Sequence, residues 1–239
     1  MRIKTDSNIN EVYTILSESK PQLAAQEPKT SAAWNKVLRE AKGKGTSIFY
    51  EYEINGNQMV HFRQTAGYDE YFVHLIVVPF AKDKYQYLHW QSSKVDVFKY
   101  TSHFFERYKE RMNVKGNMKQ AVKRYFKNAK SMVCVYWKND RFVYVMDDGL
   151  VLGVADQQLG MKVGCTFVSY NLLKNSQRTS FDKIQAVVED MRNVHMYLVG
   201  YGVSNKDSAE VIDNKFGDIR EAAEEIYSWY FEEGDLRIR

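Results

Sequence analysis

The residues best suited to chemistry lie in one stretch, Ser102-His-Phe-Phe-Glu-Arg-Tyr-Lys-Glu-Arg-Met112. An α-helix over this stretch places His103, Arg107 and Arg111 at i, i+4 and i+8, in a row along one flank. An imidazole titrates near neutral pH and can take a proton from a hydroxyl or give one to a leaving oxygen. Guanidinium forks match two phosphate oxygens and stabilise the extra charge of a transition state. The row therefore suits phosphodiester chemistry without a metal ion.

The same helix must also pack on the rest of the protein. Its apolar residues fall within a sector about 100° wide, which predicts the core-facing stripe Phe104, Phe105, Tyr108 and Met112. Glu106, Lys109 and Glu110 fall on the opposite, solvent-facing side. A purely structural interpretation stays open: an Arg beside an apolar stripe covers the core with its stem and pairs with Glu110, and a His in the first turn caps or packs.

The surrounding pattern predicts an α+β fold, with antiparallel sheets and helices packed on them. Helical periodicity covers residues 11–18, 31–42, 103–112, 117–130, 180–199 and 207–233, with breaks at Pro21 and Pro28, and with Ser31 and Ser180 as caps. Aromatic and β-branched residues predict strands at 48–54, 59–62, 71–78, 85–90, 95–99, 132–137, 141–146, 150–155 and 162–170. We expect three segments: N-terminal helices and a β subdomain (1–99), a helix-helix-four-strand subdomain (100–170) and a helical segment (171–239).

Charge is unevenly distributed. Residues 100–130 hold nine Lys and Arg against Glu106 and Glu110, and residues 207–235 hold ten acids against Lys215 and Arg220. A basic helical pair suits a polyanion such as RNA, whose phosphates release counterions on contact. The residues expected to contact phosphates are Lys115, Lys119, Lys123, Arg124 and Lys127. Alternatively, these side chains are an ordinary solvated face, and the acidic segment neutralises them.

Residues 100–170 resemble the barnase–EndoU–colicin–RelE superfamily of metal-independent ribonucleases. The resemblance is carried by the order of two helices and four strands, by His-x3-Arg-x3-Arg on the first helix, and by the last strand, Cys165-Thr-Phe-Val-Ser-Tyr170. It implies cleavage of RNA by attack of its own 2′-hydroxyl, which leaves a 2′,3′-cyclic phosphate. The roles that it implies are His103 as general acid or base, Arg107 and Arg111 on the scissile phosphate, and Thr166 and Ser169 (or Tyr170) as orienting groups.

Composition restricts the remaining possibilities. The chain has 239 residues, 44% apolar and 27% charged, which excludes a disordered or low-complexity class. No window has the roughly 20 apolar residues that a membrane helix requires, and the first residues lack a secretion signal. Two cysteines cannot form a disulfide scaffold. We therefore expect a cytoplasmic protein that does not associate with a membrane.

No cofactor or metal is expected from the motifs. His61, His74, His89 and His103 are separated by 13 to 15 residues without Cys or carboxylate partners at ligand spacing, which favours structural roles, although a zinc site assembled across strands stays open. The hypothesis that follows is a toxin-like endoribonuclease. The alternatives are a non-catalytic nucleic-acid-binding module and a protein-interaction domain, with RNA or another polyanion, or an inhibitor or partner protein, as the ligand.

Overall fold

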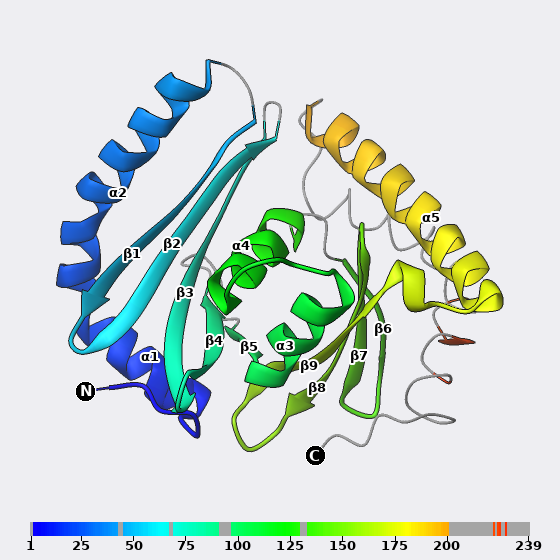
Figure 1. Cartoon of the computed structure of the whole chain (residues 1–239), viewed down its shortest axis with the longest axis horizontal. Coiled ribbons are helices and arrows are strands. Elements are labelled where there is room, and N and C mark those ends of the chain that lie inside the picture. The colour runs from blue at the N-terminus through cyan, green and yellow to red at the C-terminus, as the bar shows by residue number, and fades with distance from the viewer. Residues whose placement is uncertain are drawn as a thin grey trace. The chain divides into compact units, whose positions relative to one another are not determined.

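The computed structural model describes residues 2–42, 45–66, 69–90, 97–129 and 133–200, together with 222, 224, 225 and 228. Its contacts divide the chain into two compact units. The first unit is Met1–Lys130 with Val154–Thr166, and the second is Ser131–Gly153 with Phe167–Arg239. Helices and a mixed, mostly antiparallel sheet confirm the predicted α+β class (Figure 1). Among the described helices, none is long and apolar enough to cross a membrane.

The first unit begins with the helices α1 (Ile9–Glu18) and α2 (Lys20–Ala41). The predicted breaks at Pro21 and Pro28 are wrong, because α2 is continuous through both, and Ser31 lies inside it. Pro21 falls in the first turn, where backbone N–H groups have no partner within the helix. Pro28 removes one hydrogen bond, but α2 continues beyond it and buries the Trp34 side chain. Packing of the distal turns therefore outweighs the local proline penalty.

The predicted strands 48–54 and 59–62 correspond to β1 (Ser47–Ile54) and β2 (Asn57–Ala66), which pair antiparallel as a hairpin. The two residues between them, Asn55 and Gly56, have φ angles of 51° and 76°. Positive φ at both positions is the requirement of the two-residue turn that matches the twist of paired strands. Asn and Gly adopt this conformation at least cost, so the local sequence specifies the turn.

The sheet of the first unit continues through β3 (Asp69–Ala81), β4 (Lys84–Trp90) and β5 (Val97–Tyr100). Its strand order is β1-β2-β3-β4-β5-β9-β8, where β8 is Gly149–Asp156, and β5 pairs parallel with β9 (Met161–Ser169). On one face, α1 packs on residues such as Met59, Ile76 and Leu88. Figure 1 shows α2 lying along the outer strands β1 and β2.

The helices α3 (Ser102–Arg111) and α4 (Met118–Asn128) confirm the predicted basic helical pair. Each begins with a side-chain cap: Thr101 accepts a hydrogen bond from the N–H of Phe104, and Asn117 accepts one from the N–H of Gln120. Their apolar stripes meet in a fully buried aromatic cluster made of Tyr100, Phe104, Phe105, Tyr108, Tyr125 and Phe126. Burial of this cluster fixes which flank of α3 remains exposed.

The second unit contains β6 (Val133–Lys138), β7 (Arg141–Met146), β8 (Gly149–Asp156, shared with the first unit) and α5 (Asn175–Gly200). Strand order here is β9-β8-β7-β6, and a 3-10 turn (Tyr170–Leu172) follows β9. The predicted cap at Ser180 is wrong, because α5 starts at Asn175 and the Ser180 hydroxyl bonds to the carbonyl of Ser176. The predicted helix 207–233 lies outside the described residues, apart from 222, 224, 225 and 228.

Candidate functional site

Packing of α3 positions the row of His103, Arg107 and Arg111. Phe104, Phe105 and Tyr108 are fully buried, so the residues at i, i+4 and i+8 from His103 lie along the edge of the buried stripe. The side chain of His103 is 57% exposed and that of Arg107 is 40% exposed. Both can therefore be reached by a ligand from solvent.

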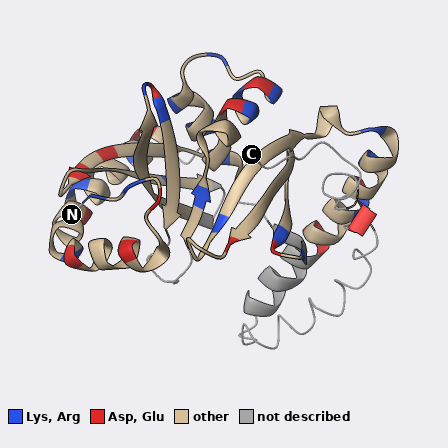
Figure 2. Ribbon diagram, turned by 90° about the horizontal axis from the view of Figure 1, so that it is seen from below, with Lys and Arg blue, Asp and Glu red and all other residues tan. Residues whose placement is uncertain are grey.

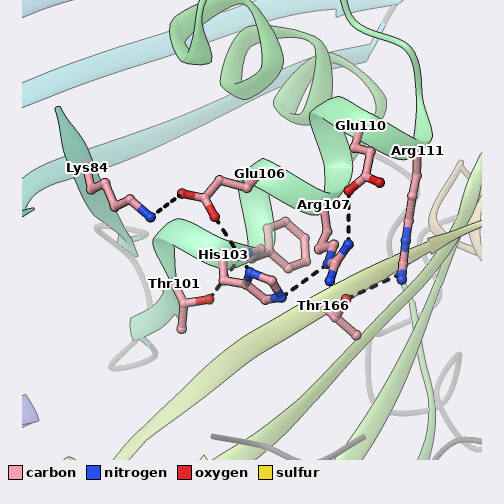
Figure 3. A network of polar contacts seen from close by, with 9 residues as sticks. Lys84, Thr101, His103, Glu106, Arg107, Glu110, Arg111 and Thr166 are labelled. Carbon is pink, nitrogen blue, oxygen red and sulfur yellow. Dashed lines mark hydrogen bonds and ion pairs between the residues drawn. The ribbon is translucent and has the colours of Figure 1, made fainter. Parts of the chain in front are cut away.

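The contacts within the row define the state of the imidazole (Figure 3). Arg107 Nε donates to Nε2 of His103 at 3.2 Å. A guanidinium N–H is always a donor, so Nε2 accepts and the ring proton of neutral His103 resides on Nδ1. Nδ1 faces the Glu106 carboxylate at 3.6 Å. His103 therefore lies between the guanidinium of Arg107 and the carboxylate of Glu106.

Two acidic side chains of α3 form ion pairs with basic residues in or beside the row. Arg107 Nη1 forms an ion pair with Glu110 Oε2 at 3.0 Å. Glu106 also pairs with Lys84 Nζ at 3.1 Å. The second guanidinium, that of Arg111, donates from Nη1 to the hydroxyl of Thr166 at 3.4 Å, which connects α3 to β9 (Figure 3). The structure therefore brings together His103, Arg107, Arg111 and Thr166, with the guanidinium of Arg107 partly neutralised by an acid.

Ser169 was predicted to orient the phosphate together with Thr166. It belongs to the second unit, where its side chain is buried and its hydroxyl has no hydrogen-bond partner among the described residues. The role implied for Ser169 stays a prediction. Cys165, next to Thr166, is no candidate nucleophile, because burial raises the pKa of its thiol to about 11 and keeps it protonated at neutral pH.

Two functional neighbours were missed by the sequence reasoning. Glu106 was placed on the solvent-facing side, yet it contacts His103 three residues earlier, at an i, i+3 spacing that brings side chains together on a helix. The i, i+3 spacing of His103 and Glu106 is the feature of the sequence that indicates this contact. Lys84 comes from the start of β4 and has no local signal that connects it to α3.

The five predicted phosphate-binding residues do not form one uniform face. Lys119 pairs with Glu51 at 2.7 Å, and both Lys119 and Lys123 lie over the Phe49 ring. Arg124 donates to the carbonyl oxygen of Met112, the C-cap of α3. The remaining two, Lys115 and Lys127, are exposed. Figure 2 shows basic and acidic residues interspersed along the described part of the chain.

The acidic segment predicted to balance the basic pair lies almost entirely outside the described residues. Two of its carboxylates are described, and both contact the second unit. Glu224 pairs with Lys138 at 3.7 Å, and Glu225 accepts a hydrogen bond from Ser180. These two acids therefore have partners within their own unit.

Comparisons with protein-family models, with curated proteins and with solved structures found no match to this chain. The functional argument accordingly depends on the site geometry.

Proposed function

We propose that this protein binds RNA at the row formed by His103, Arg107 and Arg111 and cleaves it without a metal ion. The observation that carries the proposal is the position of His103, with Nδ1 facing the Glu106 carboxylate and Nε2 accepting a hydrogen bond from Arg107 Nε. A carboxylate at Nδ1 fixes the tautomer, orients the ring and stabilises the imidazolium that forms on proton transfer. At 3.6 Å the carboxylate lies beyond direct hydrogen-bond distance, so this role requires it to move closer to Nδ1 when RNA binds.

The proposed step is an intramolecular transesterification. Nε2 of His103 takes the proton of the ribose 2′-hydroxyl while the 2′-oxygen forms a bond to the adjacent phosphorus. The bond from phosphorus to the 5′-oxygen breaks, and that oxygen takes a proton from water. The products are a 2′,3′-cyclic phosphate and a free 5′-hydroxyl, and His103 returns its proton to the hydroxide left in solvent.

The two guanidiniums supply the charge stabilisation. Arg107 contacts His103 and Glu110 in the absence of RNA. A phosphate is a stronger acceptor for a guanidinium than a neutral imidazole, so we expect Arg107 Nε to turn from His103 to the scissile phosphate. This exchange exposes the lone pair of Nε2 at the moment when the substrate is bound. Arg111, held through Thr166, provides a second fork for the same phosphate.

Purified protein incubated with RNA in EDTA tests the proposal. We expect cleavage that leaves cyclic phosphate ends, a roughly 10²- to 10⁴-fold slower rate for His103→Ala, and a smaller loss for Glu106→Gln. Lys109→Ala is the matched control, because Lys109 lies on the same helix outside the row, and it should keep the wild-type rate. Intact RNA with the wild-type protein, or a full rate with His103→Ala, would contradict the proposal.

A second candidate is non-catalytic binding of nucleic acid by the basic pair. It is favoured by the exposed positions of Lys115, Arg124 and Lys127. It predicts affinity for RNA that falls steeply with salt, and a salt slope that decreases by about 1 for each of these residues replaced by Ala. Binding that is insensitive to salt would exclude it, and turnover in EDTA would favour the ribonuclease instead.

A further inference from the structure

A cavity of about 410 Å³ lies between α2 and the neighbouring face of the sheet in the first unit. The residues that line it are Leu23, Ala24, Gln26, Glu27, Thr30 and Ser31 from α2, and Tyr52, His61, Arg63, Phe72, His74 and Trp90 from the strands. Its volume is in the range of small-ligand sites. Two histidines lie together on its sheet side.

Strand register brings these two histidines together. His61 on β2 and His74 on β3 are directly opposite each other in the antiparallel pairing. Residues in such a pair project their side chains on the same face of the sheet with neighbouring Cβ atoms. The ring centroids are 4.9 Å apart, and the two Nδ1 atoms approach to 3.5 Å. His61 is 8% exposed, so this approach occurs in a site largely shielded from water.

The distance between the two nitrogens fits a chelate. Imidazole nitrogens bind Zn²⁺ at about 2.0–2.1 Å, and a tetrahedral angle between two such bonds places the nitrogens about 3.4 Å apart. The observed 3.5 Å differs from this value by a tenth of an ångström. By contrast, 3.5 Å exceeds the usual 2.7–3.2 Å range of a hydrogen bond donated by nitrogen. The pair is thus better spaced for a shared cation than for a direct hydrogen bond.

We infer that His61 and His74 chelate a divalent transition-metal ion of the Zn²⁺ class through their Nδ1 atoms. Imidazole ligands suit Zn²⁺, Ni²⁺ and Cu²⁺ more than Mg²⁺ or Ca²⁺. No group of three His, Cys, Asp or Glu residues able to hold a metal occurs among the described residues, so the described part of the chain supplies two ligands. The remaining positions are open to the cavity, where they take water or a small anionic ligand. The site connects β2 to β3 and is independent of the proposed cleavage, which proceeds in EDTA.

Calorimetric titration of untagged, EDTA-treated and dialysed protein with Zn²⁺ tests this inference. We expect one equivalent to bind, and binding at least tenfold weaker in both His61→Gln and His74→Gln, because either change destroys the chelate. His103→Gln is the control: it removes an exposed histidine outside the cavity and should bind Zn²⁺ as the wild type does. Wild-type protein that binds no Zn²⁺, or undiminished binding in both cavity variants, would overturn the assignment.

A second measurement needs no variant and therefore remains decisive if a cavity variant fails to fold. In nitrogen NMR spectra of the wild-type imidazoles, Zn²⁺ should fix His61 and His74 in the tautomer protonated at Nε2, with the metal on Nδ1. The resonances of His103 should not change. Shifts confined to other histidines, or no shift at one equivalent of Zn²⁺, would refute the chelate whatever the outcome of the cleavage assay.

Discussion

Acidification is expected to destabilise the first unit through one partly buried side chain, His74. Burial lowers the pKa of this imidazole from 6.5 to about 4, with smaller contributions from His61 and His89. The imidazole of His74 becomes protonated at about pH 6.5 in the unfolded chain, but only at about pH 4 in the folded protein. The stabilising effect of the neutral ring is therefore complete above pH 6.5 and is lost progressively as the pH falls to 4.

The size of this effect follows from the difference between the two pKa values. One pKa unit corresponds to about 1.4 kcal/mol, so the full loss below pH 4 is about 3 kcal/mol. At pH 5 the same linkage gives about 2 kcal/mol. Glu27, His61 and Arg63 line the same cavity, so the pH dependence of the wild type alone does not isolate His74. The quantity to measure is the difference in unfolding free energy between the wild type and His74→Gln, which cannot titrate.

Urea denaturation of both proteins at pH 7.5, 6 and 5, in EDTA, provides the assay. The advantage of the wild type over His74→Gln should shrink by about 2 kcal/mol between pH 7.5 and pH 5. A difference that stays constant over this range would refute the reasoning. Direct NMR titration of the wild-type ring gives an independent check, because a midpoint near 6.5 instead of 4 would show that burial does not suppress protonation.

Two further predictions concern backbone geometry. In Gly149→Ala, the new Cβ would lie 2.1 Å from the carbonyl oxygen of Val168, so the unfolding free energy measured in urea should fall by on the order of 3 kcal/mol. An unfolding free energy equal to that of the wild type would show that the strands move apart easily to make room for the methyl group. Thr101→Ala removes the hydroxyl that accepts from the N–H of Phe104 and should lower the unfolding free energy by about 1 kcal/mol. Thr101→Ser keeps a hydroxyl and should retain most of the wild-type unfolding free energy. Equal losses in both variants would show that the capping hydrogen bond does not stabilise α3.

Local signals account for the part of the fold that the sequence predicts well. The strands on either side of Asn55-Gly56 and the apolar stripes of α3 and α4 follow from patterns of a few residues. These elements are therefore found near their predicted ranges, whereas α2 begins at Lys20, well before its predicted start at residue 31. The predicted division of the chain at residues 99 and 170 stays a prediction.

Non-local effects account for what the sequence does not predict. Pro28 reads as a helix break, but burial of Trp34 beyond it is a tertiary effect that no local rule contains. Similarly, the parallel pairing of β5 with β9, with Phe98 opposite Lys162, joins strands that are far apart in the chain. Propensity identifies such strands but does not specify their neighbours.

The same distinction separates the two candidate sites. The row of His103, Arg107 and Arg111 depends only on helical periodicity, so its positions follow directly from the sequence. His61 and His74 are brought together by the register of β2 and β3. Their separation of thirteen residues in the sequence gives no ligand spacing, whereas the strand register places the two tilted rings side by side, with centroids 4.9 Å apart.

The charge count along α3 and α4 overstates the electrostatic attraction of this surface for a polyanion. Nine basic residues against two acids suggest a strong field, yet Arg107 is paired with Glu110, and Lys119 with Glu51 from another element. Exposed pairs of this kind are weak, typically below about 1 kcal/mol, so a phosphate can displace the carboxylate from either cation. The field that an approaching RNA meets is nevertheless smaller than the count implies. Affinity should then depend on contacts made after docking, and the exchange of Arg107 from His103 to phosphate would be the event that couples binding to the release of the base.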